Sequence, residues 1–311
     1  MALGEGARLG EHIRLVRPLG SGASASVWLA RHEGLGREVA VKIAAPEVVR
    51  DEVALARFDR EARLAEQMLT PHVARGYDHG FTEEGRPYLV MELLEGETLE
   101  DRLARAGRLT PDDVVAILTP VAEALDEAHE LGIVHRDIKP SNVFLSGDRG
   151  VVKVLDFGMA KRTGVAEVSV VTDEGTSVGT PDYMSPEQLR FAREVDHRAD
   201  LWSLAVVAYR AIVGRLPFVS GSFAGLCMAI CNGRYTPPSQ QDPRLPIALD
   251  AWFERSLHLE RDRRFRSAKE TVTTLARALE ARTNKARWTL AIVLMGIVSV
   301  ALGALVAWLV S

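Results

Sequence analysis

The spacing of hydrophobic and polar residues changes near position 95 of the chain. Before it, short runs alternate between apolar and polar residues, as in Glu-Val-Ala-Val-Lys-Ile at 38–43, where Lys42 lies on the face opposite Val41. After it, apolar residues recur at helical spacing to about residue 281. The pattern predicts an α+β chain of two lobes: a tail at 1–11, a strand-rich N-terminal lobe at 12–95 and a helical C-terminal lobe at 96–281.

One segment of the first lobe has helical rather than alternating spacing. Apolar residues recur at i, i+4, i+7 and i+11 from Phe58 to Leu69, which predicts a helix at 52–69. Glu61 lies within this stripe, and an acid on a buried face needs a cationic partner because its desolvation is costly. We expect that partner to be Lys42; the alternative is that Glu61 sits at the edge of the stripe near solvent. Strands are expected at 13–19, 74–81 and 87–92 as well as at 38–43.

The longest predicted helix of the second lobe begins at Thr110. A capping threonine, Pro111 at the first helical position and two acids in the first turn all favour an N-terminus, and Gly132 ends the helix after Leu131. Pro120 lies inside it and should kink it or leave one carbonyl unpaired, at an interior cost of about 3 kcal/mol unless relieved. Other helices are expected at 98–106, 200–213, 247–257 and 267–281, with a proline-rich loop at 235–246.

Composition restricts the class of protein and its partners. In 311 residues, 38 Lys and Arg are outweighed by 42 Asp and Glu, so a nucleic-acid partner is not expected. The two cysteines, Cys227 and Cys231, cannot form a disulfide framework and indicate a reducing compartment. Their i, i+4 spacing would put two metal ligands on one helix face, but no second Cys/His pair has zinc-site spacing, so inert buried thiols are the preferred interpretation.

The C-terminal segment 288–310 contains no charged residue. As a helix it would be about 34 Å long, enough to cross a bilayer core of about 30 Å with some tilt. The basic residues Arg282, Lys285 and Arg287 make up a juxtamembrane segment at 282–287, which predicts that the chain before it is cytoplasmic, at the plasma membrane, with only Ser311 beyond the span. No secretory signal is expected at the N-terminus. Small residues at Ser299, Gly303 and Ala307 could let two such helices pack as a homodimer.

The most informative polar residues lie between positions 135 and 158. The sequence His135-Arg136-Asp137-Ile138-Lys139-Pro140-Ser141-Asn142 is followed by Asp156-Phe157-Gly158. An acid, a lysine two residues later, an amide five residues later and a second acid before a glycine suit a loop that holds a metal phosphate beside a hydroxyl. Each residue alone is common in turns, but the ordered set is not.

This ordered set resembles the H-R-D-x-x-x-x-N catalytic loop and the D-F-G motif of protein kinases. The resemblance implies a two-lobed kinase fold that uses ATP with Mg²⁺ or Mn²⁺. It implies that Asp137 accepts the proton of a substrate hydroxyl, that Lys139 steadies the transferred phosphate, and that Asn142 and Asp156 hold the metal ions. A lysine two residues after the catalytic acid is typical of the serine/threonine branch.

The same resemblance implies an ATP site in the first lobe. Gly20-Ser21-Gly22 is similar to the glycine loop that covers the phosphates, although Ala25 stands where the third glycine belongs, and a slightly stiffer loop is expected. Lys42 would hold the α and β phosphates and pair with Glu61. Met91 would be the gatekeeper, and the backbones of Glu92 and Leu94 would pair with adenine. The expected ATP-binding residues are Leu19, Gly20, Gly22, Val27, Ala40, Lys42, Glu61, Met91, Glu92, Leu94 and Asp156.

Residues 159–185 occupy the place of an activation loop. Thr172, Thr176 and Ser177 are the candidate phosphoacceptors, and Arg136 would supply a cation for a phosphate. Thr180 is interpreted as structural, bonding toward Asp137 and Lys139. The Ser185-Pro186-Glu187 motif is similar to A-P-E and most like bacterial members of the family. By the same resemblance Glu187 pairs with Arg264 and Asp200 braces the catalytic loop.

The sequence therefore predicts a membrane-anchored serine/threonine protein kinase of the bacterial eukaryotic-like type, autophosphorylated on its activation loop and acting on protein substrates. The main alternative is a tethered pseudokinase or scaffold that binds nucleotide or partners without turnover. The match of Lys42, Asp137, Asn142 and Asp156 to the active pattern disfavours this alternative. A small-molecule kinase of the same fold is disfavoured by segment 180–187, which resembles a platform for protein substrates.

Overall fold

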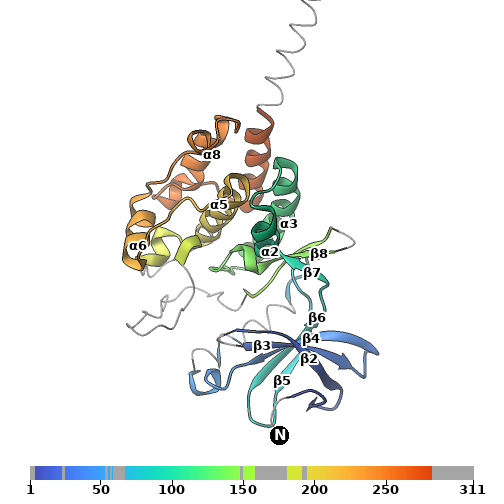
Figure 1. The fold of residues 1–311 in the computed structure, drawn as a ribbon. Coiled ribbons are helices and arrows are strands. Elements are labelled where there is room, and N and C mark those ends of the chain that lie inside the picture. Colours follow the sequence, from blue (N-terminus) through green and yellow to red (C-terminus); the bar gives the residue numbers. More distant parts are fainter. Residues whose placement is uncertain are drawn as a thin grey trace, which may run out of the picture.

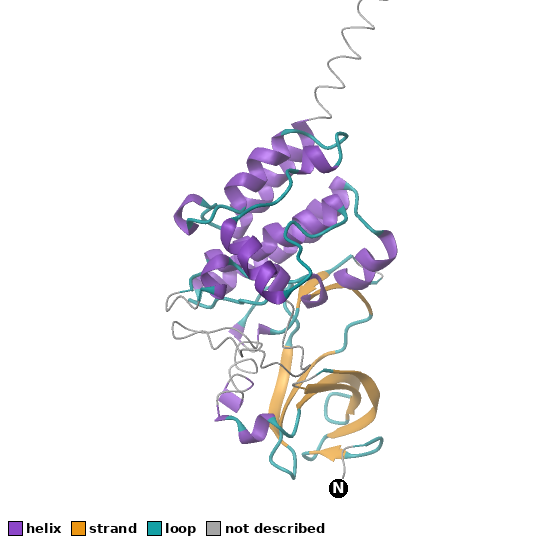
Figure 2. Ribbon diagram, turned by 60° about the vertical axis from the view of Figure 1, so that its left-hand side comes forward, coloured by secondary structure: helices purple, strands orange, loops and turns teal. Residues whose placement is uncertain are grey.

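The protein folds into two lobes, one of strands and one mainly of helices (Figure 1). In this computed structural model residues 4–281 are described, apart from 23–24, 53–54, 57, 59–66, 148–149, 158–180 and 191–194. In the structure β6 ends at Glu92, and the next strand, β7, begins at Gly96. Coloured by secondary structure, the strands gather at one end and the helices at the other (Figure 2).

A six-stranded antiparallel sheet makes up the N-terminal lobe. Its order is β1-β2-β3-β4-β6-β5, so that β4, which carries Lys42, lies inside the sheet. Ala40 and Lys42 face Met91 and Leu89 of β6 in register. The strands are β1 (Arg8–Leu9), β2 (Ile13–Ser21), β3 (Ala25–His32), β4 (Arg37–Ala44), β5 (Gly76–Phe81) and β6 (Pro87–Glu92).

The sheet begins before the expected boundary at residue 12. Leu9 is buried and pairs with Ile13, so part of the predicted tail 1–11 is a strand of the sheet. Leu9 and Ile13 belong to a small apolar core on one face of the sheet, together with Val39, Val41 and Tyr88. A two-residue strand is too short to show alternation, which is why the pattern placed it in a tail.

The C-terminal lobe is built around α5 (Arg198–Val213), in which nearly every side chain between Ala199 and Ile212 is buried. Trp202 and Tyr209 are its largest buried side chains. The other helices are α2 (Leu99–Ala106), α3 (Pro111–Glu130), α4 (Pro186–Leu189), α6 (Phe223–Asn232), α7 (Pro238–Gln241) and α8 (Ala248–Ser256), and residues 268–281 are also helical. The predicted loop at 235–246 was therefore wrong in part, because α7 lies within it.

The long helix α3 has the predicted start. The Thr110 side chain accepts a hydrogen bond from the Asp113 N–H, and Pro111 occupies the first turn. Pro120 lies inside the helix, which continues unbroken to Glu130. Because proline has no N–H, the carbonyl of Ala116 lacks its intrahelical donor, so the consequence of Pro120 is a lost hydrogen bond and not an end of the helix.

A three-stranded sheet joins the lobes and delivers the second acid of the motif. It consists of β7 (Gly96–Thr98), β8 (Val143–Ser146) and β9 (Val152–Val154), in that order. Gly96 has a φ of 146°, and a Cβ there would stand 2.0 Å from the Leu145 carbonyl oxygen. Only glycine allows this close approach of the two strands.

Several predictions fall on residues outside the described part of the chain. They are Glu61, Thr172, Thr176, Ser177, Thr180 and the C-terminal segments 282–287 and 288–310. Within the described residues, no helix is both long and apolar enough to span a membrane.

Candidate active site

The catalytic-loop motif folds into a tight loop that brings its polar groups together. Lys139 Nζ lies 2.7 Å from Asp137 Oδ2, and Asn142 Nδ2 donates to the Asp137 carbonyl at 2.8 Å and to Oδ2 at 3.1 Å. A short 3₁₀ helix, Pro140–Asn142, bends the chain so that Asn142 returns to Asp137. Among the described residues nothing bonds to Asp137 Oδ1, and the side chain is about 30% exposed. One carboxylate oxygen is therefore left for a group outside the chain.

Asp200 of α5 holds the backbone of this loop by hydrogen bonds. It is the third residue of α5 and fully buried, and its carboxylate accepts the N–H groups of His135 and Arg136 at 2.8 and 2.7 Å. Burial acts to raise the pKa of Asp200, but hydrogen bonds from His129 and from the Arg136 N–H outweigh it, so the pKa lies below its usual value. The carboxylate is therefore ionised and fixed under the catalytic loop.

Asp156 reaches the same place from β9. The Leu155 N–H donates to the Asn142 carbonyl at 2.8 Å, and the His135 ring lies 4.6 Å from that of Phe157, which ties the two motifs together. Lys42 Nζ lies 2.6 Å from Asp156 Oδ1. This contact joins β4 of the first lobe to the second lobe.

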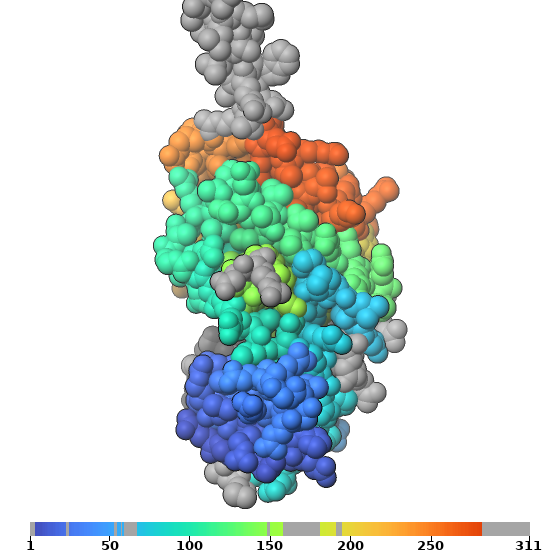
Figure 3. All heavy atoms as spheres, turned by 90° about the vertical axis from the view of Figure 1, so that its right-hand side faces the viewer, coloured from blue at the N-terminus to red at the C-terminus, as the bar shows by residue number. Residues whose placement is uncertain are grey.

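A cavity of about 490 Å³ opens between the lobes beside these groups. Its lining is mostly apolar, with a few polar side chains that include Lys42, Thr98 and Asp156, the usual character of a small-molecule site. Nine of the eleven expected ATP-binding residues line it: Leu19, Gly20, Val27, Ala40, Lys42, Met91, Glu92, Leu94 and Asp156. Figure 3 shows the surfaces of the two lobes, with the blue start of the N-terminal lobe at the bottom and the green to orange C-terminal lobe above it.

The two remaining expected residues are not in the lining. Gly22 is described but does not line the cavity; its N–H donates to the Ala25 carbonyl at 2.8 Å. Glu61 lies outside the described residues. Ala25, at the position of the missing third glycine, begins β3 and pairs with Ala44, and an extended strand residue needs no glycine.

The family of the chain follows from comparison with known proteins. The sequence profile of the protein kinase domain matches residues 13–295. The chain belongs to the protein kinase family. The serine/threonine-protein kinase PknB of Mycobacterium leprae is 36% identical over 262 residues, which are 83% of this chain and 42% of that protein. PknH of Mycobacterium tuberculosis is 38% identical over 266 residues, 85% of this chain and 41% of that protein. The chain thus spans about two-fifths of the length of these relatives.

Solved structures agree with the architecture of this kinase. The crystal structure of the Mycobacterium tuberculosis PknI kinase domain superposes with a TM-score of 0.71 at 29% identity, over 89% of this chain and 100% of that one. The fold is therefore the two-lobed protein kinase fold, and the matched relatives are bacterial serine/threonine-protein kinases.

The donor atoms in the kinase site suit the metal that the family implies. With Nδ2 of Asn142 directed at Asp137, its Oδ1 is left as an acceptor, and Asp156 supplies a carboxylate; oxygen donors of these types are the ligands that Mg²⁺ prefers. Among the described residues no cluster of three His, Cys, Asp or Glu forms a metal site of its own. Asn142 and Asp156 would hold the ion together with the phosphates.

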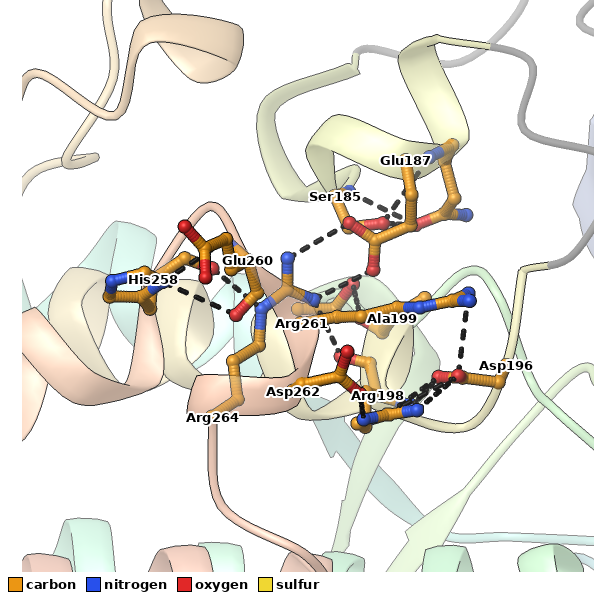
Figure 4. A network of polar contacts seen from close by, with 12 residues as sticks. Ser185, Glu187, Asp196, Arg198, Ala199, His258, Glu260, Arg261, Asp262 and Arg264 are labelled. Atoms are coloured by element: carbon orange, nitrogen blue, oxygen red, sulfur yellow. Dashed lines mark hydrogen bonds and ion pairs between the residues drawn. The ribbon is translucent and has the colours of Figure 1, made fainter.

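The segment after the activation loop is anchored by a buried ion pair. Arg264 donates to both carboxylate oxygens of Glu187, at 2.7 and 2.9 Å, and also to the carbonyls of Arg198 and His258 (Figure 4). The Arg264 side chain is fully buried, and the expected pair with Glu187 is present. Arg198 in turn bonds Asp196 and Asp262.

Sequence reasoning missed several polar residues of the kinase site. Gln188 completes a capping box with Ser185 and donates to the Arg136 carbonyl at 2.8 Å, which ties α4 to the catalytic loop. The Ser-x-x-Gln spacing is a signal that could have found it. Lys153 of β9 pairs with the carboxylate of Glu92, the last residue of β6, and His129 bonds to Asp200. Neither of these two has a local signal, because the partners are far away in the sequence.

Proposed function

We propose that this chain is a serine/threonine protein kinase that transfers the γ-phosphoryl group of ATP to serine and threonine hydroxyls of proteins. One observation carries the proposal: Asp137, Lys139 and Asn142 form one bonded group, and the Leu155 N–H ties it to the chain just before Asp156, which pairs with Lys42 in the lining of the cavity between the lobes. These are the groups that phosphoryl transfer requires, and each has an orientation suited to it.

Asp137 is the residue that acts on the acceptor. Its Oδ2 is held by Lys139 and Asn142, and its Oδ1 can take the hydroxyl proton and orient the attacking oxygen. Lys139 places a positive charge next to the Asp137 carboxylate, close to where negative charge develops on the transferred phosphoryl group. Lys42 and the apolar walls hold the nucleotide. When bound, Mg-ATP supplies the phosphoryl group, and the ion neutralises part of its charge.

The acceptor class rests on Lys139 and on the anchored segment from Pro181 to Gln188. Lysine at this position is typical of serine/threonine kinases, and the Glu187–Arg264 pair and the Gln188–Arg136 bond keep a protein-binding platform next to Asp137. Autophosphorylation at Thr172, Thr176 or Ser177 would put a phosphate on the activation loop. That phosphate could then pair with the Arg136 guanidinium.

Incubation of the full chain with labelled ATP and Mg²⁺ or Mn²⁺ tests this proposal. We expect label in the chain itself and in a generic protein substrate, on serine and threonine. Asp137→Asn should lower the rate by at least about 100-fold, since general-base assistance contributes about 10²–10⁴. ATP binding with no label in either protein would favour the scaffold alternative, and equal labelling by the variant would contradict the role of Asp137.

We further propose that residues 288–310 cross the plasma membrane, with the kinase domain in the cytoplasm, and that small residues pair two such helices. Support comes from the uncharged length of the segment and its basic flank. The full chain should float with liposomes and give a cross-linked dimer. Gly303→Ile should float equally well but lose most of the dimer and of the autophosphorylation. If a chain that lacks residues 282–311 still floated with the liposomes, the membrane anchor would be contradicted. If Gly303→Ile gave as much cross-linked dimer as the wild type, the proposed helix packing would be contradicted.

A further inference from the structure

Helix α6 carries both cysteines of the chain on one face, next to a methionine. The helix spans Phe223–Asn232 and lies at the outer edge of the helical lobe (Figure 1). Cys227 and Cys231 are four residues apart, and Met228 is three residues before Cys231. Residues three and four apart are neighbours on a helix surface, and the three side chains fall within an arc of about 100°. The helix thus places two thiols and a thioether within reach of one another.

This sulfur face is open to solvent, because the packed face of α6 is a different one. Leu226 and Ile230 are buried in the core of the lobe, where the helix packs against α4. Cys227 and Cys231 are half-buried, and the Met228 side chain is 65% exposed. The two thiols are therefore not the buried groups that the sequence indicated, and an ion in solution can reach them.

The spacing of the two cysteines does not suit a disulfide bond. Residues i and i+4 of a helix have Cβ atoms about 5–6 Å apart, whereas a disulfide needs about 3.5–4.5 Å. Burial and the neighbouring Cys231 raise the pKa of Cys227, which disfavours the thiolate that reacts with oxidants. An ion between the sulfurs removes both obstacles, because it spans the gap and displaces the thiol protons.

The donor atoms decide which kind of ion fits. Thiolate and thioether sulfurs are soft ligands, which select Cu⁺ over hard cations such as Mg²⁺. Structural Zn²⁺ sites almost always have four protein ligands, and the described part of the chain holds no group of three or more His, Cys, Asp or Glu suited to a metal. Cu⁺ is satisfied by two or three sulfur ligands, which is the number that this face of α6 offers.

We propose that Cys227, Met228 and Cys231 form a binding site for Cu⁺ on α6. Each thiol loses its proton to solvent as its S–Cu bond forms, and the Met228 sulfur donates a lone pair without losing a proton. One Cu⁺ with two thiolates has a net charge of −1. The guanidinium of Arg190 donates to the Cys231 carbonyl at 2.9 Å and brings a positive charge to this end of the helix. None of the three residues lines the cavity between the lobes, so the site is separate from that of the nucleotide.

Competition for Cu⁺ tests the site. The full chain, reduced and kept free of oxygen in a non-ionic detergent, is titrated with Cu⁺ in the presence of bathocuproine disulfonate. We expect one tightly bound ion per chain. Cys227→Ser and Cys231→Ser should each lower the affinity by more than roughly 100-fold, since loss of an outer-shell partner alone costs about 10–100-fold. Met228→Leu should lower it by roughly 10-fold, because a neutral thioether is the weaker ligand.

A variant with displaced thiols separates this site from thiol binding in general. Cys231→Ser combined with Ala229→Cys keeps two cysteines and Met228, but the cysteines are then two residues apart and do not face each other. It should bind Cu⁺ as weakly as Cys231→Ser alone. If it bound as tightly as the wild type, any two thiols would suffice and the proposal would be overturned.

X-ray absorption at the copper edge identifies the ligands directly. We expect sulfur as the only ligand atom, with three sulfurs in the wild type and two in Met228→Leu. Oxygen or nitrogen ligands in the wild type would overturn the proposal, and so would an unchanged affinity in either Cys→Ser variant. An unchanged affinity in Met228→Leu would reject the three-sulfur site.

Discussion

Two non-glycine residues with positive φ, Arg136 and Asp156, lie in the candidate active site. Arg136 precedes Asp137 with a φ of 66°, and Asp156 itself has a φ of 58°. Among the described residues no other non-glycine side chain has a positive φ. Such conformations cost about 1–3 kcal/mol each and persist only where several contacts enforce them. Here those contacts are Asp200, Gln188 and Lys42, so the strain coincides with the site.

Arg264 shows how much a single buried contact contributes at the residue scale. Arg264→Met should lower the free energy of unfolding by about 3–5 kcal/mol, because it leaves the Glu187 carboxylate without its partner. Chemical denaturation followed by tryptophan fluorescence measures this. Arg244→Met is the control: Arg244 makes a similar pair with Asp242, but its side chain is 71% exposed, so the loss should stay below about 1 kcal/mol. Equal losses would contradict the role of burial.

The elements show which local signals were sufficient. The capped start of α3, the alternating strand β4 and the apolar helix α5 lie within two residues of their predicted bounds, because caps and periodicity are local properties. β1 and α7 were not predicted. A two-residue strand exists only because β2 offers it a partner, and a four-residue helix in a proline-rich stretch carries too little periodicity to be indicated.

Pro120 offers a test at the level of one helix. Pro120→Ala restores the donor for the Ala116 carbonyl and should raise the free energy of unfolding by roughly 1–3 kcal/mol, less than the full interior cost because proline also restricts the unfolded chain. Pro111→Ala is the matched control at the first turn of the same helix, where proline is well tolerated, and should change stability little. A destabilised Pro120→Ala variant would show that the ring has a packing role.

At the scale of the whole molecule, ion pairs join parts that are distant in the sequence. Lys42–Asp156 and Lys153–Glu92 connect the two lobes. A more local group lies at the start of the second lobe, where Arg102 and Arg105 of α2 hold Glu97 of β7. The hydrogen bonds from Arg105 and Arg102 lower the pKa of Glu97 from 4.5 to about 2. The folded state therefore stabilises the ionised form of the Glu97 carboxylate.

The sign of the acid response follows from this shift. A folded-state pKa below the unfolded one gives stability that is complete above about pH 4.5 and is lost as the pH falls toward 2. Urea midpoints between pH 2 and 6 should therefore decline more steeply in the wild type than in Glu97→Gln. Glu95→Gln is the control, an acid of the same strand connection. Parallel curves for the wild type and Glu97→Gln would contradict the assignment.

The sequence by itself determined the family, the two lobes and the chemical identity of the site residues, because these depend on the order of residue types and on local periodicity. The tertiary structure decided which groups face one another. Lys42 against Asp156, Lys153 against Glu92 and His129 against Asp200 are separated by 61 to 114 positions. No local pattern encodes such pairs, since each forms only after burial of the apolar cores has brought distant elements together.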